Sequence, residues 1–317
     1  MSHTETPRLS DHRALIFDVY GTLIDWETGI YDFLRPFFPG ESREELVMHY
    51  GNVEANLQTR YPTAKYPKIL EMAFRRMTHS SDVDDVGEES TDVNNFKASA
   101  SREVTQGTLS GLTSTASEDD DAVRFGASIA GWKPFPDTVA ALHKLKKHFA
   151  LIVLSNVDGE SFEKTHAQLS SPAYTNGGSA YPTVTPESPF SLILTAQRIG
   201  SYKPDPLMLR AALQQLGSCP DPSLPSNPAI CVDKSHVLTV ANSLRHDILP
   251  SMQEGLHNVW ISRHGVSIIG SRGGSLGDIQ VTQEEGLAGG RHPYTWRFET
   301  LGGLADAVEA EIGIHAV

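Results

Sequence analysis

Short apolar runs alternate with helical patterns along most of the chain, and polar residues follow where the runs end. The run Ala14 to Phe17 predicts a buried strand that ends at Asp18. Further strands are predicted over 150–154, 191–196, 236–241 and 258–262. Helical patterns follow over 138–148, 159–169, 207–216 and 245–254. This alternation indicates a doubly wound α/β fold, a parallel sheet with helices on both faces.

A helical block interrupts this pattern after the first strand. Its helices are predicted over 30–38, 43–57 and 69–77, and the α/β pattern resumes at Trp132. We therefore expect a polar tail (1–11), a core (12–28 and 132–317) and an inserted helical cap (29–131). Residues 79–124 have few large apolar side chains, so we expect a disordered excursion there. Residues 263–293 predict a second loose insertion before a last strand (296–301) and helix (304–312).

The negative charge of the chain is concentrated in the predicted excursion. The 317 residues have a formal net charge of -13, from 26 Lys and Arg against 39 Asp and Glu. Residues 81–121 hold 11 acidic residues and 2 basic ones, so this segment alone accounts for -9. Without a basic footprint we expect no nucleic-acid partner.

Compartment and membrane association follow from what the sequence lacks. No stretch approaches the roughly 20 apolar residues of a membrane span, and residues 1–13 have no apolar signal region. Two cysteines, Cys219 and Cys231, do not make a disulfide framework. We therefore expect a cytoplasmic protein that acts on a small molecule and binds no membrane.

The residues with candidate chemistry lie behind the predicted strands, where ligands bind in such sheets. Asp18 opens the turn Asp-Val-Tyr-Gly-Thr, from which a carboxylate can attack an electrophilic carbon or phosphorus. Ser155 and Asn156 follow the second core strand and can bind an oxyanion or a carboxylate. Each residue alone also fits ordinary turn chemistry.

Two later loops add charged groups. Lys203, in Tyr-Lys-Pro-Asp-Pro, can pair with Asp18 and keep it ionised. Asp247 follows Asn242 and Ser243 in the first turn of a predicted helix, where the helix dipole favours a carboxylate. It can activate water or hold a metal, or simply begin the helix.

Together these motifs resemble the haloacid dehalogenase superfamily, over about 13–27 and 132–263. Tyr20 stands where phosphatases of the superfamily carry a second Asp, and this is similar to the type II L-2-haloacid dehalogenase branch. The resemblance implies that Asp18 is the nucleophile, with Lys203 as its charge partner and Asp247 helping to activate water. It implies an aspartyl-ester intermediate, no cofactor, and substrate contacts through five residues: Tyr20, Ser155, Asn156, Asn242 and Ser243.

The resemblance leaves the substrate open. Bacterial-type enzymes bind the halide with an Arg early in the cap, and His49 aligns there, with Arg43 and Arg60 nearby. A Mg²⁺-dependent phosphatase is the alternative, although Asn242 replaces a carboxylate that many phosphatases use for the metal. A third reading is a degenerate member whose acidic loop binds a partner. Dimerisation is common among such relatives, so a homodimer is also left open.

Overall fold

The core of the molecule is a six-stranded parallel sheet with the strand order β5-β4-β1-β6-β7-β8. The computed structural model describes residues 7–79, 114–170, 184–217, 231–263 and 292–314. The strands are β1 (Ala14–Phe17), β4 (Ala150–Ser155), β5 (Leu192–Thr195), β6 (Val237–Ala241), β7 (His257–Ile261) and β8 (Trp296–Phe298). The parallel sheet predicted from the alternating pattern is confirmed, with strand ends shifted by a few residues.

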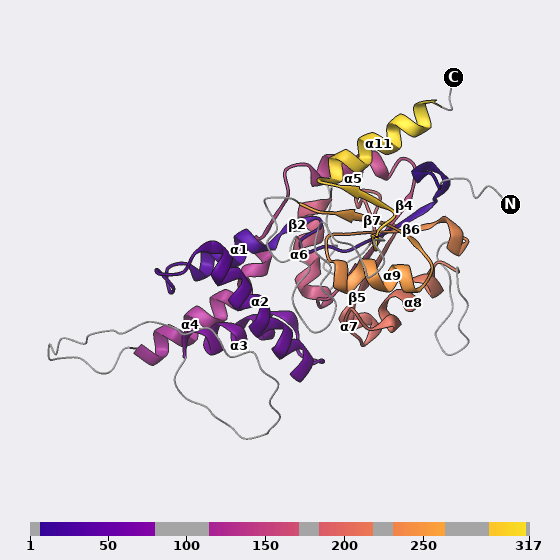
Figure 1. Cartoon of the computed structure of the whole chain (residues 1–317). Coiled ribbons are helices and arrows are strands. Elements are labelled where there is room, and N and C mark those ends of the chain that lie inside the picture. The colour runs from indigo at the N-terminus through magenta and orange to yellow at the C-terminus, as the bar shows by residue number, and fades with distance from the viewer. Residues whose placement is uncertain (1–6, 80–113, 171–183, 218–230, 264–291, 315–317) are drawn as a thin grey trace, which may run out of the picture.

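Helices cover both faces of the sheet (Figure 1). Alternate residues of β1 point to opposite faces, so Leu15 and Phe17 join one buried cluster while Ala14 and Ile16 join another. The first face is covered by α5 (Thr138–Leu145), α6 (Gly159–Leu169) and α11 (Leu301–Ile314). On the second face lies α8 (Pro206–Gln215), and α7 (Ala196–Ile199) follows β5. This two-sided packing buries every residue of β1.

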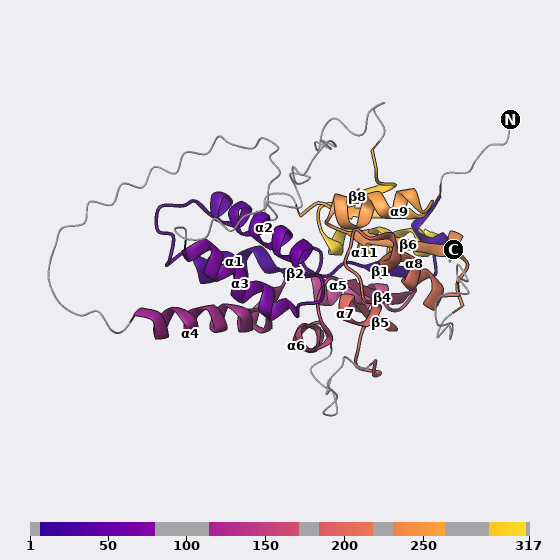
Figure 2. The same ribbon diagram turned by 90° about the horizontal axis from the view of Figure 1, so that it is seen from below.

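A helical block stands to one side of the sheet (Figures 1 and 2). It consists of α1 (Trp26–Leu34), α2 (Arg43–Arg60), α3 (Tyr66–Thr78) and α4 (Ser114–Ala127). A two-stranded antiparallel ribbon, β2 (Ile24–Asp25) and β3 (Lys133–Pro134), joins the block to the core. The block thus lies between the first strand and the rest of the core, as an insertion would.

The prediction of a disordered excursion over 79–124 is wrong for its last part, because α4 begins at Ser114. Tertiary packing overrides the weak helical tendency of its Ser and Asp residues. Phe125 is fully buried, and its ring centroid lies 5.9 Å from that of Phe74 on α3. Residues 80–113 lie outside the described part of the chain, as does nearly all of the loose insertion predicted over 263–293.

Two predicted helices differ from those observed. The first was expected over 30–38 but begins at Trp26, since the Asp25 carboxylate caps it by accepting from the Thr28 N–H at 3.1 Å. The helix expected over 245–254 consists of a π-helical turn (Leu244–Ile248) followed by α9 (Leu249–Gln253). This turn carries Asp247, so its irregular geometry affects the site.

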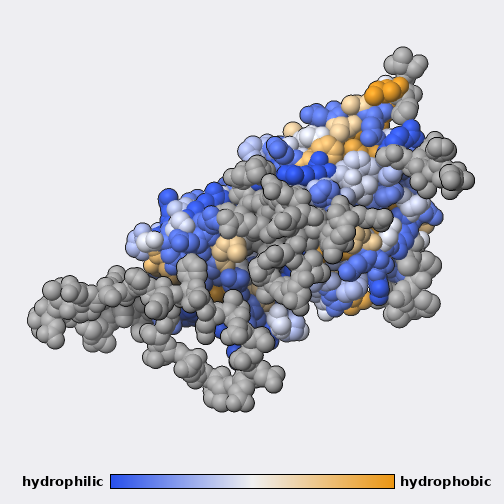
Figure 3. All heavy atoms as spheres, in the orientation of Figure 1, coloured by the Kyte–Doolittle hydropathy of each residue, from blue (hydrophilic) through white to orange (hydrophobic). Residues whose placement is uncertain are grey.

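The surface of the described residues is mainly polar in the view of Figure 3, with an apolar patch at the end of α11. Ile314, the last residue of that helix, is 74% exposed. None of the helices that the structure describes is both long and apolar enough to span a bilayer. Oligomeric state stays a prediction.

We expect acid to destabilise the fold through His166. Burial lowers the pKa of this imidazole to about 4, while the unfolded chain has a His pKa of about 6.5. The stabilising contribution is therefore fully present above the unfolded pKa and is lost as the pH falls from about 6.5 toward 4. Urea unfolding at several pH values should show the free energy of unfolding falling by up to about 3 kcal/mol across that window.

The matched comparison is His166→Phe, which keeps a ring beside Phe162 and Phe190 but cannot titrate. This variant should be less stable near neutral pH, because Ser188 loses its 2.7 Å hydrogen bond to His166. Its stability should depend less on pH than that of the wild type. Replacement of the exposed His143 by Asn should leave the pH dependence unchanged. Equal pH dependence in His166→Phe and wild type would contradict the assignment.

Candidate active site

Three strands bring their carboxyl ends to one place on the sheet edge. Strand β1 pairs with β4 on one side and with β6 on the other, with Phe17 level with Val153 and Val240. Asp18 follows β1, Ser155 ends β4 and Asn242 follows β6, so these residues are neighbours although they are far apart in sequence. The structure thus brings together residues that the sequence placed behind separate strands.

The turn after β1 fixes the Asp18 carboxylate. Gly21 has a φ of +95°, and a Cβ there would come within 3.2 Å of Trp26 Nε1 and 3.3 Å of Asn242 Oδ1, so the turn needs a glycine. Asp18 is 8% exposed. Its Oδ2 accepts a 2.6 Å hydrogen bond from the hydroxyl of Thr22. The carboxylate is therefore held in one orientation at the carboxyl end of β1.

Lys203 lies between two carboxylates. Its Nζ donates to Asp18 Oδ1 at 2.7 Å, to Asp247 Oδ1 at 2.8 Å and to the Leu154 carbonyl at 3.0 Å. Burial alone would lower the pKa of this ammonium, but the adjacent carboxylates of Asp18 and Asp247 outweigh it and raise the pKa above its usual value. All three ammonium protons are engaged, so Lys203 is a charged partner for both acids at neutral pH.

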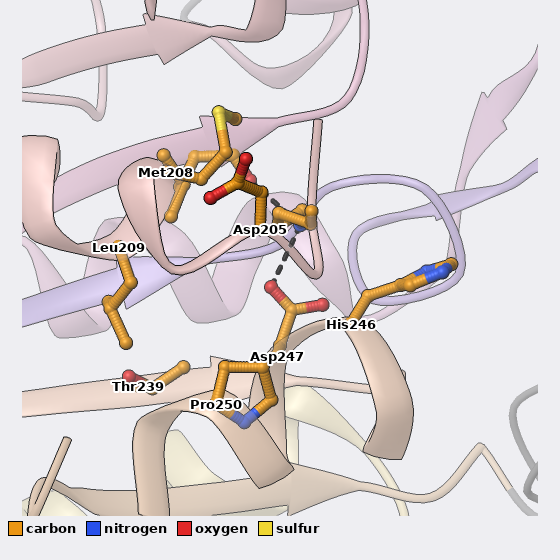
Figure 4. A pocket seen from close by; sticks show the side chains of 9 residues that line it. Asp205, Met208, Leu209, Thr239, His246, Asp247 and Pro250 are labelled. Atoms are coloured by element: carbon orange, nitrogen blue, oxygen red, sulfur yellow. Dashed lines mark hydrogen bonds and ion pairs between the residues drawn. The ribbon is translucent and has the colours of Figure 1, made fainter. Parts of the chain in front are cut away.

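Asp247 has one carboxylate oxygen in use and one free of described partners. Oδ1 accepts from Lys203 Nζ, and Figure 4 draws an interaction of the Asp247 carboxylate as a dashed line from one oxygen while the other oxygen points away. Oδ2 is buried and has no hydrogen-bond partner among the described residues. Burial raises the pKa of Asp247 to about 7, and the negative charge of Asp18 adds to this while Lys203 opposes it. An acid titrating near neutrality can exchange a proton with a bound water.

A small cavity lies beside this carboxylate (Figure 4). Met208, Leu209 and Pro250 form an apolar wall, and Asp247 and Lys203 contribute the charged side. The apolar wall explains the burial that raises the pKa of Asp247.

Three of the predicted substrate-binding residues have their polar atoms committed to the protein. The Asn156 amide pairs with the backbone of Lys203, with Oδ1 accepting at 2.7 Å and Nδ2 donating at 3.1 Å. The Asn242 amide donates to the Ile261 carbonyl at 2.8 Å. The Ser243 hydroxyl accepts from the His246 N–H and so caps the turn that carries Asp247. These side chains are hydrogen-bonded within the protein, and their contact with substrate stays a prediction.

Ser155 is different. Its hydroxyl is buried at the end of β4 and has no hydrogen-bond partner among the residues described. Buried hydroxyls in native proteins usually have a partner, so this one is available to a ligand or a water. It is the polar group next to Asp18 that best fits the predicted contact with substrate.

Two further residues predicted to contact substrate, Tyr20 and His49, lie on the side of the helical block. Tyr20 faces that block: its ring stacks on Tyr66 of α3 at 6.4 Å, and its hydroxyl lies 2.9 Å from Thr165 Oγ1. His49 is exposed and its ring contacts Phe38, with no described contact to Asp18 or Lys203. Arg43 donates to the Thr28 hydroxyl at 3.0 Å. The structure does not bring His49 into the charged cluster.

Sequence reasoning missed Thr22. Its hydroxyl joins Asp18 to the start of the loop after β6, because it also accepts from the Asn242 N–H at 2.8 Å. The available signal was its place four residues after Asp18 in the same turn, where a hydroxyl can return to the carboxylate. The residue is completely buried, and its role depends on the β1–β6 pairing.

Several solved structures share this fold. The L-2-haloacid dehalogenase from Xanthobacter autotrophicus, with chloropropionic acid covalently bound, matches with a TM-score of 0.57 and 15% identity, over 94% of this chain and 98% of that one. The defluorinating L-2-haloacid dehalogenase Rha0230 matches with a TM-score of 0.57 and 14% identity, over 94% and 95%. The HAD-hydrolase YfnB from Bacillus subtilis, bound to magnesium, matches with a TM-score of 0.52 and 15% identity, over 96% and 100%.

At the level of sequence, no curated protein matches the chain. The family model of the haloacid dehalogenase-like hydrolases matches residues 12–249, which include β1, the helical block and the core as far as the turn that carries Asp247. With the sheet order and the polar residues behind β1, β4 and β6 already in place, this match gives the assignment. The chain belongs to the haloacid dehalogenase-like hydrolase family.

Proposed function

We propose that the protein hydrolyses a small 2-substituted carboxylate through a covalent ester on Asp18, with 2-haloacids as the reference substrates. The observation that carries this is the buried cluster in which Lys203 Nζ lies 2.7 Å from Asp18 and 2.8 Å from Asp247. The cluster provides a carboxylate, a fixed cation and a second acid with a buried oxygen that has no hydrogen-bond partner among the described residues. These are the groups that a two-step displacement through an enzyme carboxylate requires.

In the first step, a carboxylate oxygen of Asp18 forms a bond to carbon 2 of the substrate. The carbon–halogen bond breaks, and the halide leaves with the bonding electrons. Lys203 keeps Asp18 ionised before attack, because its positive charge stabilises the anion in a buried setting. In this proposal the hydroxyl of Ser155, which has no hydrogen-bond partner among the described residues, donates to the substrate carboxylate.

In the second step, water attacks the carboxyl carbon of Asp18. Asp247 Oδ2 takes one proton from that water, for which a pKa of about 7 is well suited. The ester then breaks, the 2-hydroxy acid leaves with a proton on its new hydroxyl, and Asp18 returns to a carboxylate holding one oxygen from water. One proton is released to solvent together with the halide.

We also propose that no metal takes part in this reaction. The Asn242 side chain is an amide bonded to the Ile261 carbonyl, and the Lys203 ammonium fills the position between the Asp18 and Asp247 carboxylates. Among the described residues, no three His, Cys, Asp or Glu side chains gather closely enough to hold an ion. A hard divalent cation prefers several oxygen ligands, and this donor set does not fit it.

The phosphatase alternative is disfavoured by the surroundings of Tyr20. In that reading, an acid at this position would protonate the leaving alcohol. Burial raises the pKa of the Tyr20 phenol above its usual value, and its hydroxyl is bonded to Thr165. Such a phenol is a poor proton donor near neutral pH.

The direct test is single turnover with enzyme in excess over 2-chloropropionate in ¹⁸O water, followed by mass spectrometry of the peptide that contains Asp18. We expect one ¹⁸O in that peptide and none in peptides that contain other carboxylates. Product formation without label in the Asp18 peptide would refute the ester mechanism for that substrate.

A second assay separates the two activities. We expect turnover of 2-chloropropionate to be unchanged by EDTA and turnover of an aryl phosphate to be negligible with or without Mg²⁺. Phosphate release that needs Mg²⁺ and is abolished by EDTA would favour the phosphatase reading instead.

A further inference from the structure

Arg263, two residues after the end of β7, is almost completely buried and lies beside the turn that carries Asp18. Its side chain is 3% exposed, and its backbone has a φ of +48°, a left-handed conformation that residues other than glycine seldom adopt. Such a conformation persists only where surrounding contacts hold it. The contacts of Arg263 therefore indicate what the residue does.

The guanidinium donates two N–H groups to one acceptor, the carbonyl of Thr22. Nη2 lies 2.7 Å and Nε 3.3 Å from that oxygen. The hydroxyl of the same Thr22 holds Asp18 Oδ2 at 2.6 Å. Arg263 is thus one residue removed from the Asp18 carboxylate, and it acts on the backbone of the residue that orients it.

The remaining contacts anchor Arg263 to the segment where the chain returns to the core. Nη1 donates to Asp137 Oδ1 at 2.6 Å, and the guanidinium carbon lies 4.0 Å from the centre of the Phe135 ring. Asp137 in turn accepts from the Gly302 N–H at the start of α11. The Phe135 N–H donates to the Leu23 carbonyl, the next one along the Asp18 turn. The turn is held from outside at two successive carbonyls.

The guanidinium of Arg263 is fully engaged by protein groups other than Asp18 and Asp247. Its three nitrogens are all engaged, by Thr22, by Asp137 and more weakly by Thr138 at 3.5 Å. Lys203, in contrast, touches both carboxylates directly. The geometry therefore does not place Arg263 among the groups that contact reacting atoms.

We propose that Arg263 is a positioning residue that fixes Thr22 and, through it, the direction of the Asp18 carboxylate. The inference rests on the proposed role of Asp18 as the nucleophile. A carboxylate that samples several directions attacks less often in line, and a displacement of about 1 Å can cost about 100-fold in rate. Arg263 does not bind substrate, so its loss should lower kcat and leave KM nearly unchanged.

The test measures the environment of the Asp18 carboxyl group in the absence of substrate. Its outcome therefore does not depend on whether the proposed reaction takes place. The carboxyl ¹³C resonance of Asp18, assigned by its disappearance in Asp18→Asn, is compared between wild type and Arg263→Met. We expect the resonance to shift and broaden in Arg263→Met. The control Arg297→Met removes an exposed arginine that stacks on Trp260 from the neighbouring strand β8, and the resonance should stay unchanged.

Two further variants test the route through Thr22. Thr22→Val should change the same resonance, and combining it with Arg263→Met should add little, because both act on one contact. Arg263→Lys keeps the positive charge but loses the paired N–H groups of the guanidinium, so the Asp18 resonance should shift less than in Arg263→Met. If Arg263→Met does not fold, Arg263→Lys takes its place in the comparison. A folded Arg263 variant with the wild-type Asp18 resonance would overturn the proposal, whatever the substrate assays show.

Where a substrate turns over, kcat of Arg263→Met should fall about 100-fold with KM within about twofold of wild type. A rise in KM at constant kcat would overturn the positioning role. Absence of turnover in the wild type itself would refute the proposed function. The positioning role of Arg263 would then be tested by the Asp18 resonance alone.

Discussion

Replacing Asp18 by Asn should abolish hydrolysis of 2-haloacids while leaving the protein folded. Asn has nearly the same shape, so its single amide oxygen can still accept from Lys203, which now donates to Asp18 at 2.7 Å. Its NH2 group takes the place of the oxygen that accepts from Thr22 at 2.6 Å, and it can donate to that hydroxyl. An amide is a much weaker nucleophile than a carboxylate. We expect kcat to fall by about 10⁴-fold or more, the scale seen when an enzyme loses its nucleophile. Halide release and thermal unfolding, measured on the same preparation, check this.

The matched control is Asp25→Asn, in a carboxylate seven residues along the same segment. Asp25 caps α1, and Asn caps helices about as well as Asp, so stability and activity should both stay near wild type. Turnover by folded Asp18→Asn within tenfold of the wild-type rate would show that another group forms the covalent bond. Loss of folding in that variant would call instead for Asp18→Ser, which is smaller and cannot form the same ester.

Most of the sheet could be predicted from sequence because every strand except β8 is largely buried. These strands appear as short apolar runs, such as Ala14 to Phe17 before Asp18. Parallel sheets place the carboxyl ends of their strands on one edge, so the sequence predicts that Asp18 and Ser155 lie near each other. The pairing of Lys203 with Asp18 was also expected, from the need of a buried carboxylate for a cation.

The positions of α1 and α4 could not be predicted from periodicity. The start of α1 is decided by a cap at Asp25, and α4 forms in an acidic segment because Phe125 packs on α3. Both causes are tertiary or local hydrogen-bonding effects that a hydrophobic pattern does not contain.

The hydrogen bonds of the asparagines in the site could not be predicted from sequence for a related reason. The family resemblance implies that Asn156 and Asn242 contact substrate, and this stays a prediction. In the structure their amides bind the backbones of Lys203 and Ile261. An amide behind a strand can face a ligand or the protein, and only the neighbouring chain decides which. Arg263 shows the same limit, because its partner Thr22 is 241 residues away in sequence.

Replacing Lys203 by Met should destabilise the protein and stop catalysis together. The substitution leaves the carboxylates of Asp18 and Asp247 buried without the cation that now contacts both at 2.7 and 2.8 Å. Removing one partner of a buried ion pair typically costs about 3–5 kcal/mol. We expect a loss of free energy of unfolding of this order near pH 7, measured by urea denaturation, and no detectable halide release.

The pH dependence of this loss distinguishes charge from packing. Without Lys203 the folded-state pKa of Asp247, already raised to about 7 by burial, should rise further above its unfolded value. A group with a raised pKa gives stability at low pH that is lost as the pH rises through the folded pKa. Lys203→Met should therefore be most destabilised near neutral pH and should recover relative to wild type as the pH falls and Asp247 becomes protonated.

A second substitution, at Asp247, tests whether the buried acids cause the loss of stability in Lys203→Met. Adding Asp247→Asn to Lys203→Met removes an acid that the folded state must hold protonated at neutral pH, against its lower pKa in the unfolded chain. The double variant should therefore be more stable than Lys203→Met at neutral pH but still inactive. Lys144→Met, which breaks a surface contact with Asp306, should change stability far less. If Lys203→Met lost the same stability at every pH, the side chain would matter for its packing, and an ammonium holding Asp18 ionised would no longer explain the site.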